Sequence, residues 1–426
     1  MYEIMKKFEF TGETKTINLL FGTATLHRIR AVAKFGFVEI GELGGWIEKE
    51  ENLSHEENAW VYGDAKVYGN AKVYGNAEVR DKAEVCGNAI VYGNAKVGEN
   101  AKVQDKAEVC GNAIVYGNAK VGEDAEVYDN AEVCGNAEVC GNAQIYDNAE
   151  VYDKAEVYGN AQIYGNAKVR ADAKVYGKAE VCGKAGVRGK AEIWDDAKVY
   201  DNAIVCEDAN VYGNAQIYGN AKVRADAKVY GKAGVCGKAE VRGKAEIRDD
   251  ANVYGNANVY GNAKIYGNAK VYDNAKVWDD AKVYDNAEVC GNAKVWEDAK
   301  VYVNAKVYSN AEVYSNAKVY GNAKVYGNAE VCGKAEVCGK AEVFSTRHVL
   351  VIGTIGSQDD FATFYRDKDN EITVKCGYFL DKIDKFLEKV TETHGDSNYA
   401  LVCRAAVEAA RLQIDLSNEV TKDADE

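Results

Sequence analysis

Proline is absent from all 426 residues of the chain, although average usage near 5% would supply about twenty. Each proline removes a backbone hydrogen-bond donor, so its absence is typical of extended ladders of paired strands. No apolar stretch approaches the roughly 18 residues of a membrane span, and the segment MYEIMKKFEF lacks the apolar core of a secretion signal. We therefore expect no membrane partner and no export by that route.

Basic residues are outnumbered as well. The chain has 53 Lys and Arg against 67 Asp and Glu, a formal net charge of −14. A protein that neutralises the phosphates of nucleic acid needs a basic surface. We therefore expect no nucleic acid among its partners.

What the chain does contain is a six-residue repeat. From Ala59 to Ala341 an alanine stands at every sixth position and Val or Ile follows two residues later, which makes 48 copies, most often spelled A-K-V-Y-G-N. Alternation of apolar and polar residues over four positions predicts a short half-buried strand. The Gly-Asn that follows is turn chemistry, because both residues tolerate positive φ. Six residues cannot bury an apolar face alone, so neighbouring copies must stack into a solenoid.

Units such as V-Y-G-N-A-K resemble the hexapeptide repeat of left-handed β-helix proteins. The resemblance implies a mainly β fold, a left-handed parallel β-helix with three strands per 18-residue coil, so that 48 copies form about 16 coils. The flanking segments L-H-R-I-R-A, L-G-G-W-I-E and N-L-S, and I-T-V-K-C-G near the C-terminus, resemble uncharacterised bacterial and phage members of this group. These proteins are often labelled polymer-forming or transferase by repeat similarity, so the resemblance implies an architecture and no activity.

The repeat divides the chain into four parts. We expect an N-terminal capping segment over residues 1–58, the solenoid over 59–343, a small α+β domain over 344–416 and a charged tail over 417–426. An open solenoid end exposes unpaired backbone groups, so the N-terminal segment should cap it.

The flanks allow finer predictions. In the N-terminal segment we expect a mixed α/β structure over 23–38, with Trp46 and Trp60 as plugs of the solenoid end. In the C-terminal domain the residue patterns predict three strands followed by two helices. The strands are expected over 349–355, 361–366 and 371–376, and the helices over 380–392 and 398–412.

The position after each Val or Ile forms three columns when the chain is stacked at intervals of 18. One column contains no charged residue, whereas another collects five of the six arginines found at this position. The tyrosines of the uncharged column are Tyr74, Tyr92, Tyr128, Tyr146, Tyr164, Tyr200, Tyr218, Tyr254, Tyr272, Tyr308 and Tyr326. Such a strip either stabilises the ladder by cross-strand pairing or forms an association surface, and these tyrosines are the candidate interaction face.

Ten of the twelve cysteines occupy the same outward position, and no two of these ten lie 18 residues apart. Vertical neighbours on one face are therefore never both cysteine, and a disulfide needs Cα atoms within about 7 Å. We expect free thiols, a reducing compartment and a cytoplasmic location.

Enzymes of this fold depend on histidine: acyltransferases typically use a His as general base, and γ-class carbonic anhydrases need three around zinc. The four histidines of this chain, His27, His55, His348 and His394, all lie outside the repeat, and no loop interrupts the repeat. We therefore expect no catalytic residue, cofactor or metal in the array.

Two sets of residues in the flanking segments remain as candidates for chemistry. His348, Cys376, His394 and Cys403 have a spacing that fits no close-paired metal motif. His27, beside Arg28 and Arg30, could hold an anion, although packing or solvation is the favoured interpretation.

These observations predict a non-enzymatic structural or protein-interaction rod that self-associates and presents its C-terminal domain. Its partners are then other proteins or further copies of itself, with a trimer as one form. The alternatives are an acyltransferase-like hexapeptide-repeat enzyme, with its chemistry at a subunit interface or in the tail, and a carbohydrate-binding rod that uses tyrosines as platforms.

Overall fold

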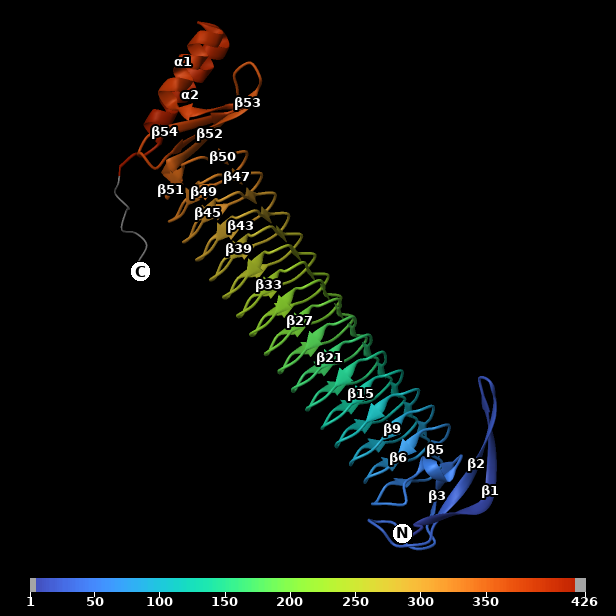
Figure 1. Cartoon of the computed structure of the whole chain (residues 1–426). Coiled ribbons are helices and arrows are strands. Elements are labelled where there is room, and N and C mark those ends of the chain that lie inside the picture. The colour runs from blue at the N-terminus through green and yellow to red at the C-terminus, as the bar shows by residue number, and fades with distance from the viewer. Residues whose placement is uncertain (1–4, 418–426) are drawn as a thin grey trace. The chain divides into compact units, whose positions relative to one another are not determined.

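The computed structural model describes residues 5–417, so the tail expected over 417–426 lies outside the described residues except for Ser417. The chain forms two compact units, one up to Gly219 and one from Asn220 onward. In both units the repeat forms a parallel β-solenoid with an 18-residue coil (Figure 1). The predicted fold class is confirmed as mainly β with a small α+β domain.

Each copy of the repeat forms one two-residue strand. These strands run from β4 (Trp60–Val61) to β51 (Glu342–Val343), one every six residues. The Ala and Val or Ile positions are buried at 0–1% exposure, so they form the continuous core. In every copy before the last, the fifth residue turns the corner with positive φ, as at Gly75 (71°) and Asp129 (56°).

Every third strand pairs in register with its counterpart 18 residues away, as in Lys72↔Ile90. Three parallel sheets result in each unit. Sheet I contains β5 (Lys66–Val67) to β29 (Asn210–Val211) in the first unit and β32 (Lys228–Val229) to β50 (Glu336–Val337) in the second. Sheet II contains β6 (Lys72–Val73) to β30 (Gln216–Ile217) and β33 (Gly234–Val235) to β51. Sheet III contains β4 to β28 (Ile204–Val205) and β31 (Lys222–Val223) to β49 (Glu330–Val331).

The N-terminal segment is built from strands, and the mixed α/β structure expected over 23–38 is wrong. β1 (Phe8–Leu19) and β2 (Gly22–Ala31) form an antiparallel hairpin. From Gly22 to Ala31 buried and exposed residues largely alternate, and that period of two suits a strand with one covered face.

The coil begins earlier than the alanine repeat. β3 (Leu43–Ile47) pairs in parallel with β5, matching Ile47 to Val67, and Leu53, after the 3₁₀ turn η1 (Glu50–Asn52), bridges to Val73. Counted along the chain, the solenoid therefore has about 17 coils, one more than the 16 expected.

Buried polar groups close the N-terminal end of the solenoid. Lys7 is 4% exposed, and its ammonium donates to the carbonyls of Glu56 (3.2 Å), Glu57 (3.4 Å) and Ala59 (2.8 Å). These bonds satisfy carbonyls of the first coil, which would otherwise be unpaired at an open end.

Trp60 is fully buried, as expected of a plug. Its ring lies 6.4 Å from that of Phe8 and 5.3 Å from that of Phe35, both edge to face. Trp46, at 9% exposure, is covered by the cations of Arg28 and Lys15.

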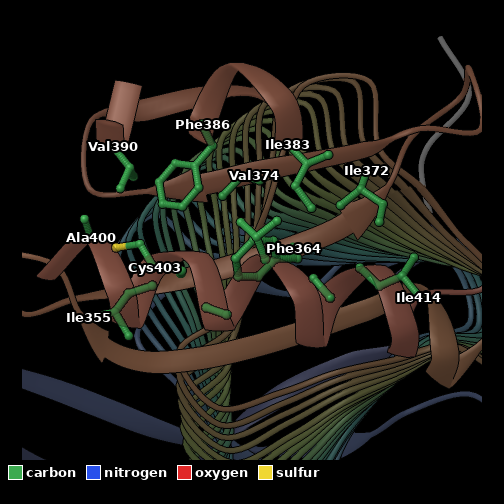
Figure 2. Close-up of a cluster of buried hydrophobic side chains, with 14 residues drawn as sticks. Ile355, Phe364, Ile372, Val374, Ile383, Phe386, Val390, Ala400, Cys403 and Ile414 are labelled. Atoms are coloured by element: carbon green, nitrogen blue, oxygen red, sulfur yellow. The ribbon is translucent and has the colours of Figure 1, made fainter. Parts of the chain in front are cut away.

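The C-terminal domain packs two helices on a four-stranded antiparallel sheet in the order β52 (Val349–Ile355), β53 (Asp360–Arg366), β54 (Ile372–Cys376), β55 (Phe379–Lys382). The helices are α1 (Ile383–His394) and α2 (Asn398–Gln413). The three predicted strands and the second helix are confirmed. Phe364 and Val374 of the sheet meet Phe386 and Cys403 of the helices in one apolar core (Figure 2).

The first helix begins at Ile383, three residues later than its apolar spacing predicts. Residues 379–382 form the edge strand β55, where Leu380 pairs with Lys375. Leu380 is 47% exposed, so it does not belong to the apolar helix face that its spacing suggested.

The C-terminal domain caps the last coil of the second unit through β53. The Tyr365 hydroxyl donates to the carbonyl of Cys338 (3.1 Å), and Arg366 donates to that of Glu342 (3.2 Å). The backbone N–H of Glu336 donates to the Thr363 hydroxyl (2.9 Å). β53 is therefore covered on both faces, by helices on one side and by the solenoid end on the other.

Within residues 5–417, neither α1 nor α2 combines the length and apolar character that crossing a bilayer requires.

Candidate functional site: the Tyr–Asn edge

The structure places all eleven predicted tyrosines directly after strands of sheet II. In the first unit they follow strands between β6 and β30, and in the second unit strands between β36 (Asn252–Val253) and β48 (Lys324–Val325). Tyr74 is 38% exposed and the other ten are half-buried. Their common column follows from the 18-residue register, whereas their role as an interaction face stays a prediction.

The tyrosine rings stack on one another wherever two occur in succession. In the first unit Tyr146 lies 5.0 Å from Tyr128 and 4.9 Å from Tyr164, centroid to centroid, with interplanar angles of 1° and 2°. In the second unit Tyr308 and Tyr326 are 4.8 Å apart at 1°. The spacing is that of the parallel strands beneath the rings, about 4.8 Å.

Stacking determines which part of each ring a partner could touch. Ring faces within a stack are covered by the neighbouring rings, so the edges and hydroxyls face outward. Burial of the rings, together with the neighbouring tyrosine, raises the pKa of Tyr128 and of Tyr308 to about 12. The hydroxyls are therefore neutral donors and acceptors at physiological pH.

A ladder of asparagine amides runs beside the tyrosines, on the second turn residue. In the first unit the amide of each Asn donates to the next over distances of 2.8–3.4 Å. These residues are Asn58, Asn76, Asn94, Asn112, Asn130 and Asn148. In the second unit a ladder of 3.1–3.3 Å joins Asn256, Asn274, Asn292, Asn310 and Asn328.

We call the eleven tyrosines and these two asparagine ladders the Tyr–Asn edge. Asparagine ladders and stacked aromatic rings both stabilise identical strands stacked in register. The edge thus stabilises the stacked coils. Its tyrosine and asparagine side chains are neutral, and the turn residues between them include four exposed aspartates, Asp129, Asp147, Asp201 and Asp273.

Cysteines interrupt the tyrosine column at Cys110, Cys182, Cys236 and Cys290, and all twelve cysteines of the protein are free thiols. Burial raises the pKa of Cys110, Cys182 and Cys290 above the ordinary thiol value. Thiols of this kind stay protonated and are poor nucleophiles.

The other two corners of the second unit also carry aromatic stacks. The lack of charged residues that distinguishes the predicted tyrosine column does not identify them, because these two columns contain arginine. One consists of Tyr260, Trp278, Trp296 and Tyr314, and the other of Tyr266, Tyr284, Tyr302 and Tyr320, with centroids 4.5–5.6 Å apart. Arginine ends each stack, with Arg242 4.9 Å above Tyr260 and Arg248 4.7 Å above Tyr266. The 18-residue columns contain this signal, because the aromatic residues are consecutive within them.

His55 and His348 each have a structural partner. The ring of His55 stacks on Phe8 at 4.2 Å and contacts Glu50 at 2.7 Å. His348 is 2% exposed and accepts from the N–H of Phe344 (3.2 Å). Burial, and secondarily the positive charge of Arg366, lowers the pKa of His348 to about 4.

Three of the four C-terminal candidates for chemistry come together. Cys376, His394 and Cys403 line one cavity of about 200 Å³ beside α1, whereas His348 is not among its lining residues. Burial raises the pKa of Cys376 to about 11, so this thiol is not activated. Within residues 5–417 no group of three His, Cys, Asp or Glu side chains is arranged to hold a metal ion.

The two arginines beside His27, which could have bound an anion, already form ion pairs with glutamates of β1. Arg28 pairs with Glu13 (3.4 Å) and Arg30 with Glu9 of β1, and the His27 ring packs against Phe10 at 4.9 Å. The favoured interpretation as packing fits these contacts.

A scan against protein-family models finds no match for the chain. A search among curated proteins likewise finds no match.

Proposed function

We propose that this protein is a non-enzymatic structural and protein-interaction scaffold, a hexapeptide-repeat solenoid of the left-handed type that associates with further copies of itself and presents its C-terminal domain. The observation that carries the proposal is the Tyr–Asn edge, in which neutral tyrosine rings and asparagine amides repeat in register along each unit of the array. Twelve free thiols fit a reducing compartment, so we place the protein in the cytoplasm.

The interior of the array supports a scaffold. Its inward positions are Ala, Val or Ile, and none of its copies contains a histidine. An acyltransferase built on this repeat would need its general base from outside the array. Tight, saturable binding of acetyl-CoA would favour that alternative.

Ring stacking argues against the carbohydrate-binding alternative. A sugar ring packs against the open face of an aromatic ring, but both faces of Tyr146 and one face each of Tyr128 and Tyr164 are covered by neighbouring tyrosines. Ring edges and hydroxyls suit a protein surface, where tyrosine is enriched.

The occupant we propose for the edge is a second copy of this chain. Hydroxyls and amides at a repeat of about 4.8 Å find partners at the same repeat on another solenoid of the same kind. Two chains of net charge −14 repel each other, and contact through neutral tyrosine and asparagine side chains brings fewer charges together than contact through the charged columns.

Light scattering coupled to size-exclusion chromatography tests this function. The molar mass of the full chain should rise above the monomer value of 46.4 kDa as the protein concentration increases. A mass of 46.4 kDa at all concentrations would remove self-association from the proposal.

A further inference from the structure

A groove of about 480 Å³ lies in the second unit, between the last coils of the solenoid and the C-terminal domain. Lys282, Lys300 and Lys318, from successive strands of sheet I, line one side. Phe361 of β53 and Lys375 at the end of β54 line the other. The C-terminal cap therefore turns part of an open solenoid face into a concave site.

The lysines of this groove belong to an unusual row. Elsewhere on the solenoid surface lysine commonly stands beside glutamate one coil away, as in Lys294 with Glu312 (2.8 Å) and Lys324 with Glu342 (2.9 Å). In sheet I, four lysines follow one another at paired positions from Lys264 onward. Like charges directly opposite each other on neighbouring strands destabilise the sheet.

Glutamates neutralise only the two ends of this row. Lys264 pairs with Glu246 at 3.5 Å, and Lys318 pairs with Glu336 at 2.7 Å. The two lysines between them, Lys282 and Lys300, make no ion pair and no side-chain hydrogen bond with any residue that the structure describes.

The rest of the groove contains both signs of charge. Lys375 contacts Glu336 at 3.6 Å, so that carboxylate is already shared by two cations. The ammonium of Lys334 lies 4.5 Å above the Phe361 ring. Asp280, Asp298 and Asp360 also line the groove, which confines an anion to the lysine row.

We propose that this groove binds a small oligoanion, a ligand with two or three phosphate or carboxylate groups in series, held by Lys282 and Lys300. Lysine is a compact cation that binds phosphate as a point charge. Lys282 and Lys300 stand on neighbouring strands about 4.8 Å apart, a spacing that suits anionic groups that follow one another along a short chain. A bound oligoanion would also relieve the repulsion within the row.

Calorimetric titration of the full-length protein with tripolyphosphate at low salt tests the site. We expect saturable binding that weakens about tenfold or more in Lys282→Gln/Lys300→Gln, with circular dichroism confirming that the variant is folded. A parallel titration with citrate distinguishes phosphate from carboxylate ligands. Tighter binding of citrate than of tripolyphosphate would show that the site prefers carboxylate groups.

The matched control is Lys276→Gln/Lys294→Gln. These two lysines are also paired neighbours, on sheet III, and neither lines the groove. The control should bind as the wild type does. Equal weakening in both double variants, or no saturable binding of either anion to the wild type, would overturn the proposal.

Discussion

Tyr146 provides the sharpest test of the stacked column, because it has a ring on each side. Tyr146→Ala removes two stacking contacts, at 5.0 and 4.9 Å. An aromatic pair contributes about 0.5–1.5 kcal/mol beyond the area it buries, so the two contacts together stabilise the local coils by about 1–3 kcal/mol. Tyr74→Ala is the graded control, since Tyr74 stacks on Tyr92 at 5.0 Å and is 38% exposed, and about half the effect is expected there.

The readout should be local, because solenoid stability is a sum of terms between neighbouring coils. Hydrogen exchange followed by mass spectrometry measures the opening free energy of peptides over 126–166. Tyr146→Phe keeps the ring and should change that free energy by less than about 0.5 kcal/mol. The reasoning is refuted if Tyr146→Ala exchanges like the wild type, or if Tyr146→Phe is as damaging as Tyr146→Ala.

Three further predictions concern pH and the caps. Folding raises the pKa of Tyr128 and Tyr308 from about 10 to about 12, so these neutral hydroxyls stabilise the folded state fully below pH 10, and the stabilisation is lost as the pH rises through 12. Thermal melts should show a melting temperature that falls over this range, and a melting temperature that is constant from pH 10 to 12 would contradict the prediction. His348, whose folded pKa is about 4, binds its proton only in the unfolded state between about pH 6.5 and 4, so acid should destabilise the C-terminal cap by up to about 3 kcal/mol. Proteolysis of that cap should lose its acid sensitivity in His348→Gln, and an unchanged pH profile in this variant would oppose the assignment. Lys7→Met leaves three carbonyls without their donor and should cost about 1–3 kcal/mol of local stability, measured as faster exchange in residues 5–62; wild-type exchange there would argue against the capping role.

The repeat could be predicted closely from the sequence because its period appears in both core and surface. Ala and Val recur without a break, and the tyrosine and asparagine columns follow from the same 18-residue register. The aromatic run from Tyr260 to Tyr314 was equally visible in that register. Arginines such as Arg242 stand in the same column, so absence of charge does not distinguish this column as it does the column of Tyr74.

The ends were harder to predict because tertiary contacts override local pattern there. Trp60 occupies an outward position of the repeat, yet the segment around Phe8 and Phe35 buries it completely. Leu380 fits helical spacing, but pairing with β54 draws it into an edge strand. The groove over Lys282 likewise depends on where β53 packs, which no local pattern determines.

Self-association through the Tyr–Asn edge is tested most directly by placing charge on it and measuring the molar mass. Arginine occurs at the equivalent position of the other two columns, where Arg242 and Arg248 pack on tyrosine rings, so we expect Tyr254→Arg/Tyr308→Arg to remain folded. The control Tyr314→Arg/Tyr320→Arg places the same charge on the other two corners, at rings that, like Tyr254 and Tyr308, have one aromatic neighbour and one cysteine neighbour in their column. In light scattering across protein concentration, we predict that the control associates like the wild type while the edge variant stays at 46.4 kDa. Equal association of both variants, or equal loss in both, would contradict the account.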